Sequence, residues 1–540
     1  MYRYSAYIGS WVLLLASLPL ALRWPGWWWG VGTGAVLVVL GSWDLLQTRS
    51  TLRRNYPILA HFRYGLESVG PEMRQYFIES DTDAAPFSRQ QRSLVYRRAK
   101  NVMDVVPFGT LQDAYAVDYE WINHSLAPTR IEGHDFRVLV GPDTAQPYLA
   151  SVFNISAMSF GSLSANAIRA LNEGARRGGF YHDTGEGSIS PYHLENGGDL
   201  VWEIGSGYFG CRDAQGRFDP VRFAEQASRP QVRMIEVKLS QGAKPGHGGV
   251  LPAAKVSAEI AVTRGVPMGV DCVSPASHAA FDTPLGLLEF VARLRELAGG
   301  KPVGFKLAIG HPWEFFGIAK AMVESGLLPD FIVVDGAEGG TGAAPAEFID
   351  HIGLPMHEAL LLVHNTLVGV DLRDKVRVAA AGKITSAFDI ARTLALGADW
   401  CNAGRGFMFA LGCIQSLSCH TDRCPTGIAT QDPRRWKNLD PADKATRVHQ
   451  FHDNTVRALR DLLCAAGLDH PSELGPEHIL RRVSPVEIRS LASLYRYLRP
   501  GELLRGIPEH AVFRDFWAEA RSDAFAPPAR VDALRRTKTG

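Results

Sequence analysis

Residues 331–343 read FIVVDGAEGGTGA, an apolar run of strand length that passes directly into a glycine-rich loop. Four glycines fall within the seven positions 336–342, so several backbone N–H groups of this loop are left uncovered by side chains. The same order of apolar run and small-residue turn recurs at 376–381 (VRVAAA) and at 399–404 (DWCNAG). Short apolar runs bounded by such turns are typical of buried parallel strands.

Eight runs of this kind lie between residues 151 and 404, and amphipathic segments with helical spacing separate them. The runs are 151–158, 178–183, 233–239, 267–272, 303–309, 331–336, 376–381 and 399–404. The intervening segments include 164–177, 253–264, 284–298, 314–325, 355–367 and 386–396. This alternation predicts an α/β fold with a parallel sheet, and eight strands predict a closed TIM-type (β/α)8 barrel. In such a barrel the chemistry lies in the loops at the carboxyl ends of the strands.

Two uncharged apolar runs precede the barrel, at 5–22 (SAYIGSWVLLLASLPLAL) and at 27–43 (WWWGVGTGAVLVVLGSW). Each is near the lower end of the ~17–25 residues that a membrane-spanning helix needs. Tryptophans favoured at a membrane interface lie at the ends of the runs: Trp24, Trp27, Trp28, Trp29 and Trp43. Basic residues flank the pair, whereas only Arg23 lies in the connection: Arg3, Arg49, Arg53 and Arg54.

This charge pattern predicts a transmembrane hairpin in the inner (cytoplasmic) membrane, with both ends and the catalytic domain on the cytoplasmic side. A cleaved signal peptide is the alternative, but it would leave the second apolar run unexplained. The string GVGTGA at 30–35 resembles part of a dinucleotide fingerprint, yet it lacks the preceding strand and the following acidic residue. We therefore expect its small residues to pack one apolar helix against the other.

The chain is predicted to have four parts, which are a transmembrane hairpin (1–46), a helical and irregular collar (47–150), a barrel with a cysteine-rich segment (151–430) and a C-terminal helical extension with a disordered tail (431–540). Within the collar, helices are expected near 59–78 and 87–102. The formal net charge of +1 over 540 residues gives no electrostatic basis for binding nucleic acid.

The loops after the last three runs combine glycine with basic residues. They contain Gly339, Gly340 and Thr341, then Gly382 and Lys383, then Gly404 and Arg405. Uncovered backbone N–H groups, a helix beginning near Arg405 and an arginine make the kind of phosphate site that is common after strands seven and eight of these barrels. A tight turn without a ligand is the alternative for any one loop, but three such loops at consecutive strand ends favour the phosphate site.

Two lysines are candidates for function. Lys306 lies inside the apolar run 303–309, and a buried lysine needs a partner because an unpaired buried charge is costly or loses its proton. A flavin ring that becomes anionic on reduction would be such a partner, and a structural ion pair is the alternative. Lys244 lies in the loop 240–249 (SQGAKPGHGG), beside Gln241 and among glycines. That composition suits a loop that closes over an anionic substrate.

Four of the seven cysteines fall between residues 401 and 424, and an odd, crowded set argues against a disulfide framework. Cys413, Cys419 and Cys424 are separated by five and four residues, so their thiolates could meet at one inorganic cluster. The CxxC pairs that zinc sites more often show are absent from the sequence. Cys401 is the candidate for a fourth ligand, and chance crowding of core cysteines is the remaining alternative.

Four stretches together resemble the synthase domain of glutamate synthase. The segment 412–431 (GCIQSLSCHTDRCPTGIATQ) is similar to the cluster segment of that family. Its other signature loops are similar to 156–162 (SAMSFGS), 241–246 (QGAKPG) and 339–343 (GGTGA). The resemblance covers residues 150–470, and with the apolar hairpin the chain resembles the stand-alone FMN-binding glutamate synthase family proteins.

The resemblance implies FMN in the barrel mouth and a [3Fe–4S] cluster on Cys413, Cys419 and Cys424. The residues implied to hold FMN are Ser156, Ala157, Met158, Lys306, Gly339, Gly340, Thr341, Gly382, Lys383, Gly404 and Arg405. Gln241 and Lys244 would face a 2-oxo acid, with Glu186 as a further catalytic residue. In the family, ammonia and 2-oxoglutarate form 2-iminoglutarate, reduced FMN delivers hydride to the imine carbon, and the cluster feeds electrons to the flavin.

The departures from the family concern the substrates more than the cofactors. Family synthases begin with a glutaminase domain, and the apolar hairpin takes that place here, so ammonia is expected from a separate glutaminase. Electrons are expected from a reductase subunit or a ferredoxin, because no dinucleotide fingerprint follows a strand. The family's acidic residue in the lysine loop is His247 here, and its substrate loop reads HDTGEGSIS at 182–190.

The leading interpretation is an enzyme that makes an amino acid, with glutamate as the first candidate, from a 2-oxo acid and ammonia or an amine. A related enzyme with the same cofactors and another substrate, as in N-methylglutamate synthesis, stays open. A membrane electron-transfer module that carries flavin and cluster without amination also stays open, as does a cofactor-free structural homologue.

Overall fold

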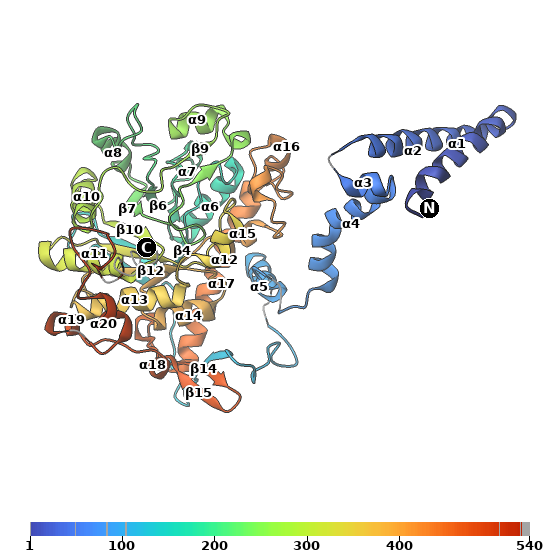
Figure 1. Ribbon diagram of the computed structural model, residues 1–540. Coiled ribbons are helices and arrows are strands. Elements are labelled where there is room, and N and C mark those ends of the chain that lie inside the picture. Colours follow the sequence, from blue (N-terminus) through green and yellow to red (C-terminus); the bar gives the residue numbers. More distant parts are fainter. Residues whose placement is uncertain are drawn as a thin grey trace. The chain divides into compact units, whose positions relative to one another are not determined.

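The computed structural model describes residues 2–48, 50–82, 85–102, 105–506, 508–529 and 531. The chain divides into two compact units, Met1–Arg89 and Gln90–Gly540, and each is described by itself (Figure 1). Arg49, which was expected to flank the hairpin, and residues 532–540, the end of the expected tail, lie outside the described residues.

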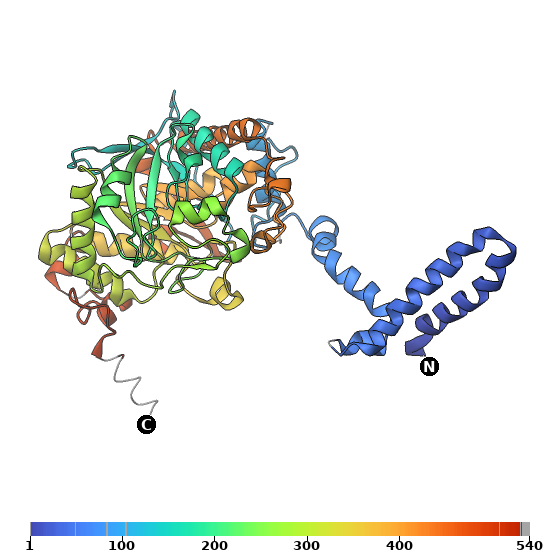
Figure 2. The same ribbon diagram turned by 90° about the horizontal axis from the view of Figure 1, so that it is seen from above.

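The first unit is built on two long apolar helices, α1 (Ser5–Arg23) and α2 (Trp28–Leu46), which run side by side (Figures 1 and 2). Glycine allows their close approach, because a Cβ on Gly34 would lie 2.9 Å from the backbone of Leu14. A Cβ on Gly30 would likewise lie 2.6 Å from the Ser17 hydroxyl. Gly30 and Gly34 thus serve helix packing, as predicted, whereas a Cβ on Gly32 would meet nothing within 4 Å, and the string lies within helix α2 and forms no loop.

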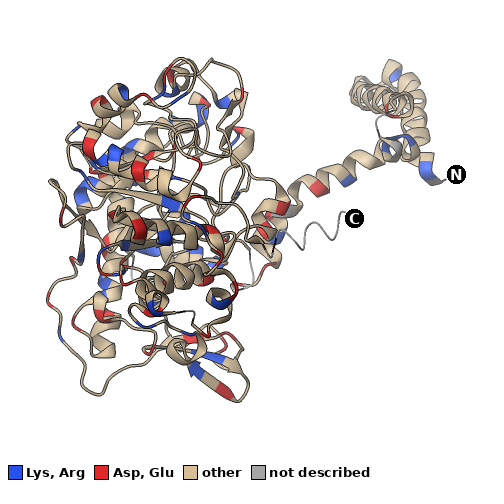
Figure 3. Ribbon diagram, turned by 60° about the vertical axis from the view of Figure 1, so that its left-hand side comes forward, with Lys and Arg blue, Asp and Glu red and all other residues tan. Residues whose placement is uncertain are grey.

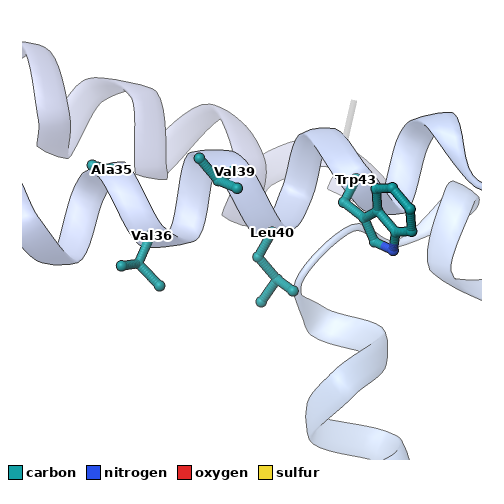
Figure 4. Close-up of a pocket in the computed structure, with 5 residues that line it drawn as sticks. All are labelled: Ala35, Val36, Val39, Leu40 and Trp43. Carbon is teal, nitrogen blue, oxygen red and sulfur yellow. The ribbon is translucent and has the colours of Figure 1, made fainter.

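Both helices are long and apolar enough to cross a membrane, by length and composition. They are almost free of the charged residues that mark the rest of the chain (Figure 3). One outer face of α2 presents an open apolar surface that is lined by five side chains: Ala35, Val36, Val39, Leu40 and Trp43 (Figure 4). Val36, Val39 and Trp43 keep 68%, 70% and 65% of their surface exposed, so neighbouring apolar side chains are uncovered together on this face.

A buried carboxylate ties the next helices of this unit to the end of α2. Asp44 is fully buried, and its oxygens accept hydrogen bonds from the Ile58 backbone N–H at 3.0 Å and from His61 Nε2 at 2.9 Å. The remaining elements of the unit are η1 (Tyr2–Tyr4), η2 (Pro25–Trp27), α3 (Thr51–Asn55), α4 (Leu59–Met73) and the π-helical η3 (Arg74–Ile78). Helices α4 and η3 occupy the stretch 59–78 that was predicted to be helical.

The second unit contains a closed parallel barrel, which confirms the predicted TIM-type fold. Its eight strands are β4 (Phe153–Ile155), β5 (His182–Asp183), β6 (Leu200–Ile204), β7 (Val232–Lys238), β10 (Val303–Leu307), β11 (Phe331–Asp335), β12 (Arg377–Ala381) and β13 (Trp400–Ala403). The barrel closes where Cys401 of β13 pairs with Phe153 of β4. Helices surround the strands (Figure 2).

One predicted strand was wrong, and one barrel strand was missed. The run 267–272 contributes no barrel strand; its end forms β9 (Cys272–Val273), which pairs antiparallel with β8 (Val250–Leu251) outside the barrel. Gly269 adopts a positive φ of 69° there, and the preceding Met268 is exposed. The missed strand is β6, whose short apolar sequence LVWEI is interrupted by Glu203, a carboxylate that faces the barrel interior.

The helices that follow the strands begin and end at clear signals. The Ser164 hydroxyl caps the start of α6, and Gly179 ends it in the left-handed conformation. The helices of the barrel are α6 (Ala165–Gly178), α7 (Pro191–Leu194), α8 (Pro220–Ala227), η4 (Ala253–Lys255), α9 (Ala258–Arg264), α10 (Pro284–Leu297), α11 (Pro312–Ser325), α12 (Ala346–His351), α13 (Met356–Gly369), α14 (Ala387–Ala395) and α15 (Arg405–Leu411). Helices α6, α9, α10, α11, α13 and α14 match the predicted amphipathic segments, and α15 begins at Arg405 as expected, whereas α7, α8 and α12 lie where no such segment was predicted.

A β-hairpin closes the amino-terminal end of the barrel. Strands β2 (Arg137–Val140) and β3 (Tyr148–Ser151) pair antiparallel, and their Val140, Tyr148 and Ala150 belong to one buried apolar cluster. The barrel residues of that cluster lie near the starts of their strands: Tyr181, Val201, Met234, Phe331, Val333, Ala379 and Trp400. The amino-terminal end of the barrel is therefore covered, and the carboxyl ends of the strands remain for a functional site.

The C-terminal part is less helical than predicted. Strands β14 (Ile479–Ser484) and β15 (Glu487–Ser490) form a hairpin, and β14 also pairs with β1 (Glu120–Ile122) of the collar region. In β14 (ILRRVS) the first side chain is buried and the other five are half-buried. The remaining elements are α5 (Arg89–Ala99), η5 (Cys419–Thr421), α16 (Pro433–Trp436), α17 (Pro441–Ala466), η6 (Pro471–Glu473), α18 (Leu491–Leu494), α19 (Glu502–Arg505) and α20 (Ala511–Phe516).

Candidate active site

The first and last barrel strands bring two predicted loops together. Ser156, Ala157 and Met158 follow β4 and are half-buried, and Gly404 follows β13. A Cβ on Gly404 would lie 3.8 Å from Met158 Sδ and 3.9 Å from Ser156 Cβ. The two loops therefore share one surface at the carboxyl end of the barrel, where a flat ring could lie against backbone.

The Arg405 side chain lies directly over the glycine loop that follows β11. A Cβ on Gly340 would occupy the position of the Arg405 guanidinium, so only glycine fits beneath it. Thr341 is half-buried beside it, and the backbone N–H of Gly339 donates to the Gly336 carbonyl at 2.9 Å. The glycine loop and the single cation that were predicted to hold a phosphate group thus lie side by side, and their role stays a prediction.

Gly382 and Lys383 lie beside a different partner. A Cβ on Gly382 would lie 2.8 Å from Met356 Cβ and 3.3 Å from the Glu338 carboxyl carbon. Glu338 is fixed by the Met356 backbone N–H, which donates to its two oxygens at 2.9 and 3.1 Å. Lys383 is exposed and adopts a positive φ of 49°.

The three cysteines of the segment 412–431, here called the cysteine segment, lie next to the glycine loop. A Cβ on Gly342 would lie 3.5 Å from Cys419 Cβ, and the Arg405 guanidinium acts electrostatically on Cys419 and Cys413. Burial raises the pKa of Cys413 to about 11, and burial together with Cys424 raises the pKa of Cys419. Arg405 thus stands between the glycine loop and the thiols.

Cys424 differs from the other two thiols because backbone amides surround its sulfur. Burial acts to raise its pKa, but the Thr426 hydroxyl at 3.4 Å and the N–H groups of Ala429, Thr426 and Ile428 lower it on balance. The Gln415 backbone N–H donates similarly to Cys413 Sγ at 3.5 Å. Amide donors of this kind stabilise the thiolate form, which is the form that binds metal.

Cys401, the candidate for a fourth ligand, faces away from the cysteine segment. It is fully buried in β13, and its thiol interacts with Thr393, Asp389 and Arg392 of α14. Burial raises the pKa of this thiol far above its usual range. We therefore assign it to the packing between barrel and helix.

The predicted catalytic residues lie together around Lys238. The Lys238 ammonium lies 3.2 Å from Glu186 Oε2 and donates to Gln241 Oε1 at 3.3 Å. Lys244 is buried, and burial lowers its pKa, whereas the nearby Glu186 raises it. Burial acts to raise the pKa of Glu186, but Lys238 and Arg264 lower it on balance. The site therefore offers two lysine ammonium groups, one carboxylate and one amide.

The loop that carries Lys244 is held to the barrel by Asp335. The Gly242 backbone N–H donates to Asp335 Oδ2 at 2.8 Å, at the end of β11. His247 packs edge-on against Phe348 of α12, with ring centroids 5.5 Å apart. Asp335 links the lysine loop to the strand that leads into the glycine loop, so the two loops are positioned by one carboxylate.

Lys306 lies in a set of buried acidic side chains. Its ammonium contacts the carboxylates of Glu203 (β6) and Glu236 (β7), the second at 3.2 Å. Carboxylate oxygens of Asp183, Glu203 and Glu236 all lie within 4.8 Å of one another. We call Asp183, Glu203, Glu236, Asp335 and Lys306 the carboxylate cluster. Among the described residues, Lys306 therefore forms ion pairs with carboxylates, which was the alternative to a flavin partner in the sequence analysis.

The carboxylate cluster holds more acids than cations, so some acids keep their protons. Burial and the Glu203 charge raise the pKa of Asp183 to about 7, and burial raises the pKa of Glu236 well above its usual range. Burial opposes the charged form of Lys306, but Glu203, Glu236 and Asp183 together raise its pKa well above its usual range. Lys306 is therefore a permanent cation next to groups that hold protons near neutral pH.

The sequence analysis did not single out Lys238, Glu203, Glu236, Asp183 or Asp335. Each is a charged residue inside or at the end of a short apolar strand, the same signal that identified Lys306. The charge within each apolar run can be seen in the sequence, but the sequence does not show that these residues from different strands meet. Only the closed order of β5, β6, β7, β10 and β11 brings them together.

Comparison with known proteins identifies the family that this chain resembles. Residues 118–469 match the family model described as the conserved region in glutamate synthase. The glutamate synthase large subunit-like protein YerD of Bacillus subtilis is 36% identical over 510 residues, which cover 86% of this chain and 97% of that protein.

More distant relatives carry the same name. Archaeal glutamate synthase [NADPH] of Methanocaldococcus jannaschii is 33% identical, over 65% of this chain and 66% of its own length. The glutamate synthase [NADPH] large chain of Bacillus subtilis is 33% identical, and the match spans 21% of its length. Among solved structures, a flavocytochrome b2 variant with sulfite bound is 11% identical, with a TM-score of 0.43 over 84% of this chain and 90% of its own.

The family match covers the barrel, the glycine loops, the lysine loop and the cysteine segment in one continuous region. The full-length similarity to YerD extends over most of both chains. This chain therefore belongs to the glutamate synthase family.

Proposed function

We propose that this chain is a glutamate synthase-like oxidoreductase that uses FMN and a [3Fe–4S] cluster to aminate a 2-oxo acid reductively, with 2-oxoglutarate as the first candidate. One observation carries the proposal: Arg405 lies over Gly340 and acts on Cys413 and Cys419, so the cradle and the thiols adjoin. The group of Glu186, Lys238, Gln241 and Lys244 lies at the ends of neighbouring strands.

The residues of the barrel mouth fit FMN. The fit rests on Gly340, where any side chain would displace Arg405, and on Gly404, which keeps backbone open beside Ser156 and Met158. The proposed FMN-binding residues are Ser156, Ala157, Met158, Lys306, Gly339, Gly340, Thr341, Gly382, Lys383, Gly404 and Arg405. When bound, FMN supplies the hydride for an electrophilic carbon. Lys306 remains protonated among its carboxylates and supplies a fixed positive charge at the centre of the barrel.

The cysteine segment fits an iron–sulfur cluster of three ligands. Cys413, Cys419 and Cys424 are half-buried or buried, and amide N–H groups donate to the first and last of them. When bound, the cluster relays single electrons between a donor and the flavin. Cys401 is excluded as a ligand in this proposal because its thiol packs against α14.

The residues around Lys238 fit an α-keto carboxylate. A substrate carboxylate needs cations and donors, which the Lys238 and Lys244 ammonium groups and the Gln241 amide supply. Formation of an imine from ammonia and a carbonyl releases water, so a proton must reach the departing oxygen. Lys244 Nζ is the candidate donor, because burial lowers its pKa toward the range in which a lysine can give up a proton.

We further propose that α1 and α2 anchor the chain in the cytoplasmic membrane, with the catalytic unit on the cytoplasmic side. The support is the length and apolar composition of both helices and the basic residues Arg53 and Arg54 after them. A separate reductase or ferredoxin would supply electrons, and a separate glutaminase would supply ammonia.

A second candidate keeps the cofactors and changes the amine or the acid. His247 stands where the family has an acidic residue, and it packs on Phe348 instead of facing a cation. N-methylglutamate synthesis is one such reaction. A membrane electron-transfer module without amination is the third candidate, and the membrane hairpin is its support.

An anaerobic half-reaction tests the proposal. The full chain is purified in detergent, reduced with dithionite and mixed with 2-oxoglutarate and ammonium, while the flavin spectrum and glutamate are followed. Reoxidation with stoichiometric glutamate is the expected result. A reducible flavin and cluster that respond to methylamine but not to ammonium would select the second candidate, and a response to neither would favour electron transfer alone.

A further inference from the structure

Lys255 is a buried cation that none of the steps above uses. It ends the short helix η4 (Ala253–Lys255), directly after β8, and only 4% of its surface is exposed. Its ammonium donates to the Ala429 carbonyl at 3.0 Å and to the Ser162 carbonyl at 3.4 Å. Both partners are backbone oxygens, so they solvate the charge without neutralising it.

The contrast with Lys306 shows why this is unusual. Lys306 is equally buried but contacts two carboxylates. Among the described residues, no carboxylate forms an ion pair with Lys255 within 4 Å. Asp422 is nearby, but its Oδ1 accepts from the Gln431 backbone N–H at 2.7 Å and from the Thr430 hydroxyl at 3.1 Å. A buried charge without a counter-charge is costly, so Lys255 needs a negative partner.

The thiols of the cysteine segment are that partner by position. Cys419 and Cys424 are, with Asp422, the electrostatic neighbours of Lys255. Ala429 bridges the two groups through hydrogen bonds, because its N–H donates to Cys424 Sγ and its carbonyl accepts from Lys255 Nζ. The ammonium is thus held by the same turn that supports the sulfur.

We propose that Lys255 is the counter-charge of the cluster bound to Cys413, Cys419 and Cys424 and that it raises the reduction potential of that cluster. The inference rests on the proposed cluster. Reduction adds one negative charge to the cluster, and a buried cation stabilises the reduced form more than the oxidised form. Salt screens a buried pair only weakly, so the effect persists at physiological ionic strength.

Arg405 and Lys255 act on different pairs of the cysteine segment's thiols. Arg405 acts on Cys413 and Cys419 and lies over Gly340 of the proposed FMN site, whereas Lys255 acts on Cys419 and Cys424 and binds the Ser162 carbonyl. The cluster therefore has one cation shared with the flavin site and one of its own. Lys255 acts through the cluster and not on the substrate: it sets the reduction potential at which the cluster accepts an electron.

The test is a redox titration of the cluster, followed by electron paramagnetic resonance, in the full chain with its cofactors. Lys255→Gln keeps a donor for the carbonyls but removes the charge, and Lys255→Arg keeps the charge. Lys301→Gln is the matched control, because Lys301 is also buried and donates to two backbone carbonyls, those of Ala227 and Arg229, before β10.

We expect Lys255→Gln to lower the equilibrium constant for reduction of the cluster at least tenfold, which for one electron is a shift of about 59 mV to more negative potential. Lys255→Arg and Lys301→Gln are expected to stay within threefold of the unmodified chain. Equal potentials in Lys255→Gln and the unmodified chain, with iron and sulfide retained, would overturn the proposal.

Two further outcomes separate charge from packing. If Lys255→Gln keeps FMN but loses iron, while Lys255→Arg retains both, the positive charge stabilises the cluster itself, which supports the proposal. If both variants lose iron, the lysine acts through its shape, and the proposal is wrong. Absence of iron and sulfide from the unmodified chain would instead overturn the proposed cluster, and with it the proposed function.

Discussion

The carboxylate cluster and the cysteine segment solve opposite electrostatic problems within one barrel mouth. The carboxylate cluster surrounds Lys306 with four acids, so it has too much negative charge and keeps protons. The cysteine segment places Lys255 and Arg405 near three thiols, so it has positive charge ready for an anionic group. Burial alone therefore does not define the role of a charged group. A buried set with more acids than cations holds protons, whereas a buried set with more cations than acids suits an anionic ligand.

The largest effect is expected when a thiol of the cysteine segment is removed. We predict that Cys419→Ser loses the cluster completely while FMN stays bound, because two remaining thiols cannot hold it. Iron and acid-labile sulfide per FMN measure the outcome. Cys401→Ser is the control and is expected to keep both, since Cys401 packs against α14. Unchanged iron in Cys419→Ser would remove Cys419 from the ligand set.

The next largest effect separates substrate binding from both buried sets. We predict that Lys244→Ala lowers kcat/KM for the 2-oxo acid at least ~100-fold, because it removes a buried cation and proton donor. FMN content and cluster content are expected to stay unchanged. Steady-state kinetics with cofactor analysis would check this, and near-normal turnover would place the substrate elsewhere.

Removal of Lys306 tests the acid-rich side through stability. Lys306→Met leaves two buried carboxylates without their cation, and such a loss costs about 3–5 kcal/mol. The folded-state pKa of Lys306 is raised, so its stabilisation is fully present below pH about 10.5, the unfolded value, and at pH 8 all of it is at stake. Thermal unfolding at pH 8 should show a lower midpoint than in the unmodified chain.

The same variant should be less damaged at acidic pH, where the freed carboxylates can take up protons. A melting temperature at pH 8 equal to that of the unmodified chain would show that the ion pairs contribute nothing. Lys301→Met serves as the control for loss of a buried lysine that has carbonyl partners only.

The smallest expected effect concerns Asp183. Its folded-state pKa is raised to about 7, so its contribution to stability is fully present below the unfolded value of 3.8 and is lost as pH rises through about 7. Asp183→Asn mimics the protonated form, so we predict that its stability relative to the unmodified chain rises by on the order of 1–3 kcal/mol between pH 5 and pH 8. Melting curves at the two pH values check this, and a fall in relative stability between pH 5 and pH 8 would show that the charged form is the stabilising one.

Most of the barrel could be read from the sequence because buried parallel strands are short apolar runs. The five-residue strand β6, which contains Glu203, was missed, although β7 and β10 carry similar charges and were predicted; the apolar run with Gly269 was wrong because it lies on the surface. The strand β14 was missed because its sequence, ILRRVS, lacks a regular alternation of apolar and polar residues, and its side chains are mostly half-buried. These failures follow from tertiary contacts that a local pattern does not contain.

The candidate site divides in the same way. Glycine loops and the cysteine spacing are local patterns, so Gly340, Arg405 and Cys419 could be named from sequence. The partners of Lys306, in contrast, come from strands more than 60 residues away in the chain, and Ala429 meets Lys255 across 174 positions. Such pairs are set by the closure of the barrel, and a single sequence does not reveal them.

The β2–β3 hairpin that covers the amino-terminal end of the barrel limits the routes by which small molecules can reach its interior. Because the hairpin covers this end, we expect the 2-oxo acid, ammonia and product of the proposed reaction to enter and leave past the strand-end loops at the opposite end. The electron donor of the proposed function would approach the cysteine segment at this same end, because Cys419 adjoins Gly342 of the glycine loop. In the proposed function, substrate and electron donor would therefore use the same end of the barrel.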